Sequence, residues 1–158
     1  MPGWLKWLLI GCGSLVVIVG IGMAGCIVWL GSGPESGVKL ANDMDDYALN
    51  YLEEHELLEP GEELRAYYDY TMAMNGTEAA ILTDRRVMYH KDGSTVAFAL
   101  ADIVEVDHRE DGIMGHVIEV VDHQGDALRI EIAPLNDGPA FARALERAWQ
   151  AARPPAGA

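Results

Sequence analysis

The first apolar run of the chain is long and carries no charge. The run Trp7–Leu30 contains no Asp, Glu, Lys or Arg. As a helix rising about 1.5 Å per residue it would reach about 35 Å, enough to cross a hydrocarbon core of about 30 Å. Trp4 and Trp7 at one end and Trp29 at the other suit the two membrane–water interfaces. We therefore predict that residues 1–31 form one transmembrane anchor.

The apolar run Trp7–Leu30 has two other interpretations, both as a targeting signal. A cleaved secretory signal has a shorter apolar stretch, of about 7–15 residues, that ends at a small-residue site. Met23-Ala24-Gly25-Cys26 resembles the lipobox of bacterial lipoproteins, although apolar residues rather than a polar tether follow Cys26. A lipoprotein processed at Cys26 therefore stays an alternative to the uncleaved anchor.

The predicted anchor also carries small residues on one face. Gly13, Gly20 and Ala24 fall at i, i+7 and i+11, and small residues let two helices approach closely. We take this as a candidate helix–helix contact face, for another membrane protein or a second copy. Lys6 precedes the run and Lys39 follows it. With the terminal amine, this balance favours an N-terminus in the cytoplasm and the rest of the chain outside it.

A linker and an acidic amphipathic helix are expected in residues 32–59. Helical spacing predicts a helix from about Asp43 to Leu58, with Asn42 as N-cap, that ends before Pro60-Gly61. The region between Ala41 and Glu63 holds nine acidic residues and no Lys or Arg. We expect the apolar stripe to pack on the chain's own domain. The acidic face is a candidate docking surface for a basic partner, and the residues chosen for it are Asp45, Asp46, Glu53 and Glu54.

From Glu62 onward the apolar positions alternate, as they do in strands. Leu64, Ala66, Tyr68 and Tyr70 point one way, which predicts a strand with one face buried. Asp92-Gly93 is a two-residue hairpin signal. The strands expected after the first are Glu78–Lys91, interrupted by a turn, then Ser94–Leu100, Asp102–Arg109, His116–Val121 and Ala127–Ile132.

The chain then closes with a predicted helix. Asn136 or Asp137 can cap it, and Pro154-Pro155 stops it. Phe141, Leu145 and Trp149 would share its buried face. The expected fold class is therefore α+β: a curved antiparallel sheet or open barrel in residues 60–152, plugged by the C-terminal helix, with a short tail at 153–158.

Two short segments resemble a known family. Leu82-Thr83-Asp84-Arg85-Arg86-Val87 and Leu100-Ala101-Asp102-Ile103-Val104-Glu105-Val106 look like segments of bacterial pleckstrin-homology-like domains. The resemblance implies a seven-stranded barrel-like sheet capped by the final helix, with a binding or scaffolding role. Members that bind phosphoinositides carry basic residues in the first hairpin loop. Here that loop, 71–77, has no positive charge, so its Met72 and Met74 were instead chosen as candidate adaptable contacts.

Charge and motif content narrow the functional classes. The formal net charge of −14 disfavours nucleic acid and anionic headgroups as partners. Both cysteines lie in the apolar run, so the rest of the chain holds no disulfide. Asp107–Asp111 with His116 matches no closed zinc spacing, and no nucleotide or nucleophile motif is present. We expect no enzyme activity, no metal and no cofactor.

These features together predict a single-pass membrane-anchored interaction module. It would be an accessory or assembly subunit of a membrane protein complex in a bacterial inner membrane. Its partners would be membrane lipid, through the anchor, and another membrane protein or a second copy. A peripheral lipid or ligand sensor at the membrane surface is the alternative function.

Overall fold

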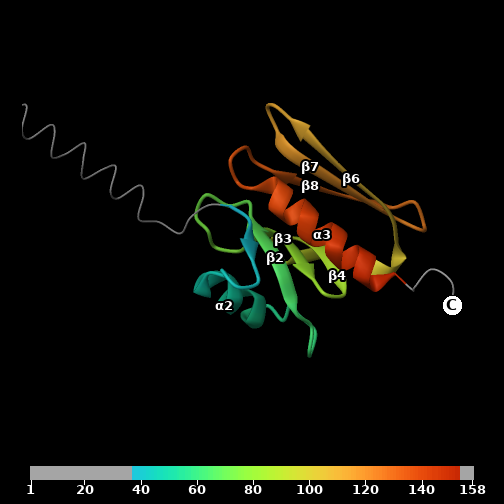
Figure 1. Ribbon diagram of the computed structural model, residues 1–158. Helices are drawn as coiled ribbons and strands as arrows, with labels where there is room; N and C mark the ends of the chain where they lie inside the picture. The colour runs from blue at the N-terminus through green and yellow to red at the C-terminus, as the bar shows by residue number, and fades with distance from the viewer. Residues whose placement is uncertain (1–36, 154–158) are drawn as a thin grey trace, which may run out of the picture. The chain divides into compact units, whose positions relative to one another are not determined.

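The structure is a computed structural model that describes residues 37–153. It contains two antiparallel sheets, ordered β1-β2-β3-β4-β5 and β6-β7-β8 (Figure 1). The strands are β1 (Lys39–Leu40), β2 (Leu64–Asp69), β3 (Glu78–Thr83), β4 (Arg86–Lys91), β5 (Ser94–Ala99), β6 (Ile103–Asp111), β7 (Gly115–Asp122) and β8 (Ala127–Ile132). The helices are α2 (Asp46–Glu54), the 3₁₀ turn η1 (Leu100–Asp102) and α3 (Gly138–Ala152).

Local chemistry explains the hairpin and the final helix. Asp92 and Gly93 both have positive φ, 47° and 81°, as a two-residue turn between β4 and β5 requires. The predicted hairpin is confirmed. Asp137 is the N-cap of α3, and its side chain accepts a hydrogen bond from the backbone N–H of Ala140. The predicted final helix is therefore confirmed, with Asp137 rather than Asn136 as the cap.

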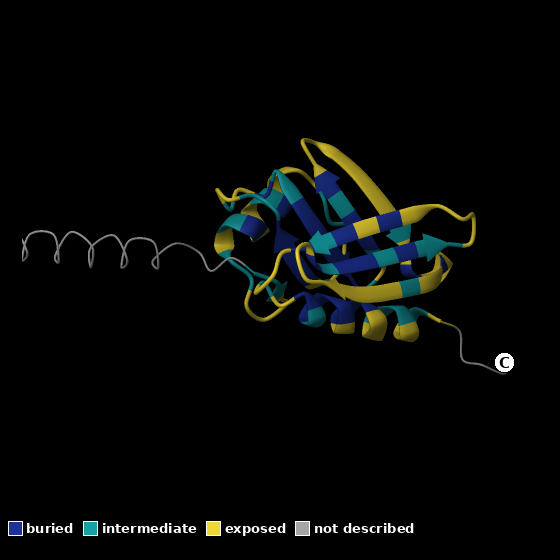
Figure 2. Ribbon diagram, turned by 90° about the horizontal axis from the view of Figure 1, so that it is seen from above, coloured by how far each residue is buried: buried dark blue, intermediate teal, exposed yellow. Residues whose placement is uncertain are grey.

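The main core lies between the inner faces of the two sheets and α3. Phe141 and Leu145 of α3 are fully buried against it. Figure 2 shows the alternation of buried and exposed residues along the strands, and the exposed outer side of α3. The sheet residues of this core are Ala66, Tyr68, Ala80, Leu82, Val87, Ile103, Ile118, Val120, Leu128, Ile130 and Ile132. Removing this apolar surface from water is the main stabilising term of the fold.

The two corners of the barrel differ. Where β2 meets β8, the backbone N–H of Glu131 donates to the Tyr70 hydroxyl at 3.0 Å, and that of Ala133 donates to the Tyr68 hydroxyl at 3.2 Å. At the other corner η1 separates β5 from β6, and the Trp149 indole N–H donates to the Ile103 carbonyl at 2.9 Å. Among the described strands neither corner has a backbone ladder between the sheets: two tyrosine hydroxyls bridge the first, and η1 connects the sheets at the second.

A second, smaller core lies on the outer face of the five-stranded sheet. Ala48 and Leu52 of α2 pack there against Tyr67, Ile81 and Met88. The prediction that this part of the sheet buries only one face is therefore wrong, because α2 covers its other face. The predicted helix bounds are also corrected: α2 runs from Asp46 to Glu54 rather than Asp43 to Leu58, and Asp45, not Asn42, is its N-cap.

Candidate interaction surface

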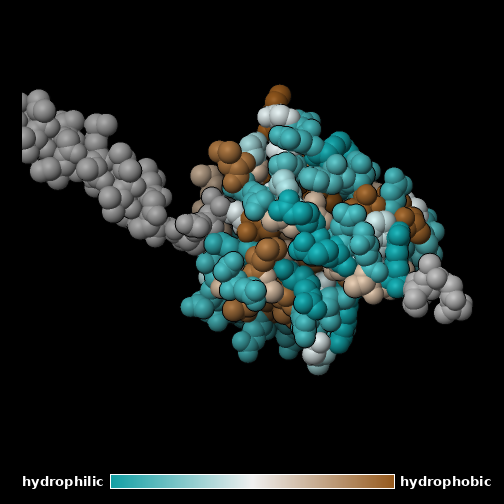
Figure 3. All heavy atoms as spheres, viewed as in Figure 1, coloured by the Kyte–Doolittle hydropathy of each residue, from teal (hydrophilic) through white to brown (hydrophobic). Residues whose placement is uncertain are grey.

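The position of α2 leaves its outer side free. The helix presents Asp46, Glu53 and Glu54 to solvent, while Ala48 and Leu52 face the sheet. Leu49 is 43% exposed, unusually open for a leucine on a helix that is packed against a sheet. Hydrophilic side chains cover most of the face seen in Figure 3, and hydrophobic ones show between them in separate patches.

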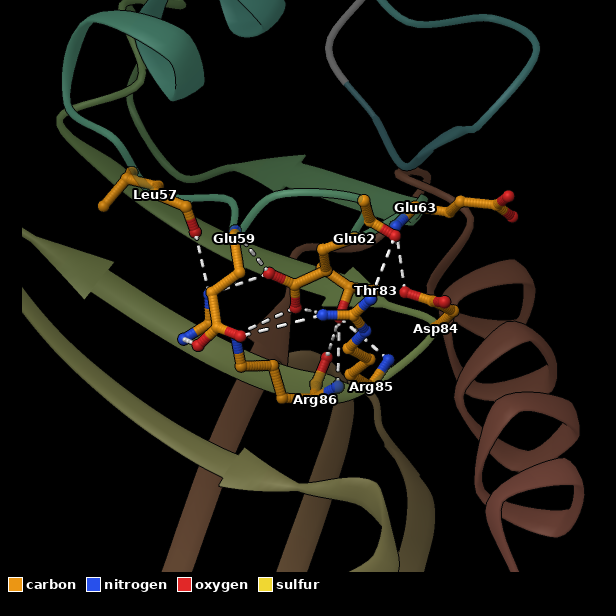
Figure 4. Close-up of polar contacts among 9 residues, drawn as sticks. Leu57, Glu59, Glu62, Glu63, Thr83, Asp84, Arg85 and Arg86 are labelled. Carbon is orange, nitrogen blue, oxygen red and sulfur yellow. Dashed lines mark hydrogen bonds and ion pairs between the residues drawn. The ribbon is translucent and has the colours of Figure 1, made fainter.

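The chain after α2 is fixed by a polar network that centres on Glu62 (Figure 4). The Arg86 guanidinium donates from Nε to Glu62 Oε1 at 2.9 Å and from Nη2 to Glu62 Oε2 at 2.8 Å. The Thr83 hydroxyl also donates to Oε1, at 2.6 Å. The same Arg86 Nη2 reaches the Leu57 carbonyl at 3.3 Å. Residues 57–62 are thereby tied to the turn between β3 and β4.

The charge of Glu62 is stabilised despite its burial. Its side chain has no solvent exposure. Burial alone would raise the pKa of Glu62, but the hydrogen bonds from Arg86 and Thr83 outweigh this effect and lower the pKa below its ordinary value. Arg86 is only partly exposed, and its pKa is raised, chiefly by the hydrogen bond to Glu62. The pair is therefore ionised at neutral pH and acts as a clamp.

Between α2 and the clamped segment lies an open groove of about 600 Å³. Three leucines and a proline supply its apolar part, and three glutamates supply its charge. The lining residues are Leu49, Leu52, Leu58 and Pro60, with Glu53, Glu56 and Glu59. Within residues 37–153, no Lys or Arg lines it. Glu53, Glu56 and Glu59 are all exposed, and of the three Glu59 forms an ion pair with the clamp, with its Oε1 3.6 Å from Arg86 Nη1.

The loop of residues 71–77 lies on the other flank of α2. Asp69 closes this loop, because its carboxylate accepts hydrogen bonds from the backbone N–H groups of Thr71 at 2.7 Å and Gly76 at 2.8 Å. The Tyr47 hydroxyl lies 3.9 Å from the Met74 sulfur. The loop that binds phosphates in phosphoinositide-binding domains is thus uncharged here apart from Asp69 at its base, and it packs on a helix.

The structure places the six candidate contact residues around α2. Asp46, Glu53, Glu54 and Met72 are exposed, and Met72 is fully so. Asp45 and Met74 are half-buried, with Asp45 3.5 Å from the Lys39 ammonium and Met74 against Tyr47. Sequence reasoning missed Leu49, Glu56 and Pro60. The signal that could have found Leu49 was an apolar residue on the acidic side of the predicted helix.

The imidazoles of His108 and His116 come together at the barrel surface. Their ring nitrogens Nε2 and Nδ1 are 3.2 Å apart, and burial lowers the pKa of His108. Over residues 37–153 no set of three or more His, Cys, Asp or Glu side chains is placed to hold a metal ion. Asp107 instead pairs with Arg109 at 3.0 Å, as a surface ion pair.

Several sequence predictions concern residues outside 37–153. They are the anchor Trp7–Leu30, its contact face of Gly13, Gly20 and Ala24, and the alternative processing at Cys26. Among the described residues, no helix has both the length and the apolar character needed to span a bilayer.

The architecture defines a class of fold: a barrel-like pair of antiparallel sheets closed by a C-terminal helix, which is pleckstrin-homology-like. In agreement, the chain is similar in structure to a DUF1696 family protein with a pleckstrin-homology domain from Shewanella loihica PV-4, solved at 2.00 Å resolution. The TM-score is 0.52 at 13% sequence identity, over 73% of this chain and 99% of the other. No protein-family model and no curated protein matches the sequence. The predicted PH-like α+β fold is confirmed.

Proposed function

We propose that this chain is a single-pass membrane-anchored interaction module that binds a basic amphipathic segment of another membrane-associated protein. The observation that carries the proposal is the α2 groove, whose lining among the described residues is apolar apart from three glutamates. An amphipathic helix lays its apolar face into such a groove and would set Lys or Arg against Glu53 and Glu56.

The energetics of such a complex divide between two terms. Leu49 and Pro60, the apolar groove residues that are exposed, supply affinity, because covering the apolar surface that they still show to water contributes about 25 cal/mol per Å². The glutamates supply specificity and a faster encounter, since the net charge of −14 attracts basic partners and repels acidic ones. The Glu62–Arg86 clamp keeps the groove preformed, which lowers the ordering cost of binding.

The anchor gives the module its place in the cell. Held by residues 1–31, the domain would meet partners that belong to the same membrane, as an accessory or assembly subunit in a bacterial inner membrane, on the non-cytoplasmic side. We propose no catalysis. The test of the anchor is fractionation: the full chain should sediment with membranes and need detergent for release. Recovery in the supernatant of detergent-free lysates would contradict this part.

The groove is tested by charge reversal in the full chain. Glu53→Lys with Glu56→Lys should remove the partner from detergent co-purification, while Glu105→Lys with Glu110→Lys on β6 should not. Both pairs change the net charge equally, and all four residues are exposed. Loss of the partner in both variants would show that net charge, and not the groove, drives binding. Retention of the partner in both variants would contradict binding in the groove. Partner binding should also weaken with added salt.

A further inference from the structure

The edge of the five-stranded sheet at β5 is exposed and unlike the other strand edges in residues 37–153. Its six residues, Ser94–Ala99, contain no charge, no proline and no glycine. All are exposed except Phe98, which is half-buried. Among the described strands only β4 pairs with β5. Every second residue of β5 therefore directs its backbone N–H and C=O away from the sheet, with no described strand opposite.

The other edges carry the protection that soluble sheets ordinarily show. The opposite edge of the same sheet, β1, is two residues long and includes Lys39. In the second sheet, β6 carries charged residues over most of its length, at positions 105, 107, 109, 110 and 111. The far edge of this sheet, β8, has the charged residues Arg129 and Glu131, and the backbone N–H of Glu131 already donates a hydrogen bond to the Tyr70 hydroxyl. An unprotected, β-branched and aromatic edge such as β5 pairs with another strand when one is offered.

From this contrast we propose that β5 is a homodimer interface, in which the β5 strands of two copies pair antiparallel about a two-fold axis. The two five-stranded sheets would become one continuous sheet. Such an interface is isologous, so it uses up both edges and closes at two copies rather than growing into a fibre.

The register follows from the pleat. Opposed residues of an antiparallel pair have side chains on the same face, so two identical strands must be centred on a residue, not between two. Centred on Val96, the pairs are Val96 with itself and Thr95 with Ala97. Centred on Ala97, they are Ala97 with itself and Val96 with Phe98. Either register opposes only uncharged, small, β-branched or aromatic side chains.

Charge favours a second copy over a foreign strand. A chain of net charge −14 repels its own copies wherever carboxylates face one another, and β5 is the edge where none do. A basic partner would find no carboxylate on β5 to attract it and would go to the acidic α2 side instead. This inference does not depend on the proposed function of the groove.

Disulfide trapping tests the pairing directly in the full chain. In a background of Cys12→Ser and Cys26→Ser, Val96→Cys or Ala97→Cys should oxidise to a dimer, because opposed Cα atoms lie about 4.5–5.5 Å apart, within disulfide reach. Val104→Cys on β6 is the matched control, since Val96 and Val104 are 51% and 53% exposed. Equal trapping at all three positions, or none at Val96 and Ala97, would overturn the proposal.

Mass measurement in detergent gives an independent readout. Val96→Lys and Ala97→Lys should each weaken the dimer, because each puts a charge into an uncharged ladder. The lysine at the central position should weaken it more, by several-fold, because it opposes its own copy. Val104→Lys should leave the protein a dimer. A wild-type monomer at every concentration, or a dimer that survives both lysines on β5, would overturn the interface. Neither result bears on the groove, whose variants are scored by partner co-purification.

Discussion

Individual residues show where polar groups carry the architecture. Glu62 and Arg86 are 24 positions apart in the sequence, yet their two hydrogen bonds fix the segment after α2. The neighbouring residues Arg85 and Asp84 play lesser parts: Arg85 Nη2 donates to the Gly61 carbonyl at 3.1 Å, and Asp84 Oδ1 accepts from the backbone N–H of Glu63 at 2.9 Å. The arginines of the Leu82–Val87 segment therefore serve the fold, and phosphate recognition is not needed to explain them.

Arg86→Met should lower the free energy of unfolding by about 3 kcal/mol, the low end for a broken buried pair because Arg86 is partly exposed. The cost arises because Glu62 stays buried without its partner. Urea unfolding of the full chain in mild detergent measures it. The double variant Arg86→Met with Glu62→Leu should recover part of the loss, and a double variant as unstable as the two single variants added together would contradict the coupling.

Gly76→Ala should destabilise the protein more than Gly93→Ala. Both glycines have positive φ, 78° and 81°, which costs an alanine about 1–2 kcal/mol. At Gly93 a Cβ meets nothing within 4 Å, whereas at Gly76 it would lie 2.6 Å from Cγ of Tyr51. Thermal unfolding of the two variants separates the clash from the backbone term. Equal losses would show that Tyr51 moves aside freely.

At the scale of elements, the sequence predicts most strands and helices, but it does not predict which helix packs on which face of the sheet. The β4–β5 hairpin and the β7–β8 pair follow from turn residues and alternation, which are local signals. The burial of Tyr67 does not, because it depends on α2 crossing the outer face of β2 and β3. The groove escaped prediction for the same reason: Leu49 and Pro60 come together only after residues 57–62 are clamped to Arg86.

Leu52→Ala should cost about 2–5 kcal/mol of stability, since Leu52 is 1% exposed in the second core. Leu49→Ala, on the same helix, should change stability by about 0.5 kcal/mol or less, as expected of a surface substitution. It should nevertheless weaken partner binding. Urea unfolding and co-purification of the two variants test this separation. A stability loss at Leu49 equal to that at Leu52 would place Leu49 in the core.

The contact between α2 and β4 should make stability depend on pH. The buried His90 lies 3.1 Å from the Tyr51 hydroxyl and 2.8 Å from the Thr95 hydroxyl. Burial, with a smaller effect of His55, lowers the pKa of His90, and Asp92 opposes the shift. The unfolded chain then binds the proton more readily, so the free energy of unfolding should fall as pH drops below about 6.5.

His90→Gln should reduce the fall in stability between pH 7.5 and 5.5, whatever its effect at neutral pH. Glu62 titrates at lower pH, because its pKa lies below the ordinary value, and so does not contribute in this window. Urea unfolding at the two pH values gives the difference. An unchanged difference in the variant would assign the pH dependence to other groups.

At the scale of the whole molecule, a PH-like barrel is combined with an added helix and a strongly acidic charge. The barrel supplies a rigid body, and α2 with the segment after it supplies a surface that the barrel alone lacks. The fold class could be predicted from the sequence because strand alternation, the hairpin turn and the cap of the final helix are local signals that point to the same fold. The partner's chemistry could not, because the groove depends on residues brought together by tertiary packing.

The most direct measurement is photo-crosslinking from within the groove in living cells. A photoreactive residue replaces Leu49 in the full chain, and a second chain carries it at Val104, which is similarly exposed, at 53% against 43%. The crosslinked peptide is then identified by mass spectrometry. We expect Leu49 alone to capture a basic amphipathic segment, and Glu53→Lys with Glu56→Lys to abolish the capture. Capture of acidic or unrelated peptides, or equal capture from Val104, would contradict the account.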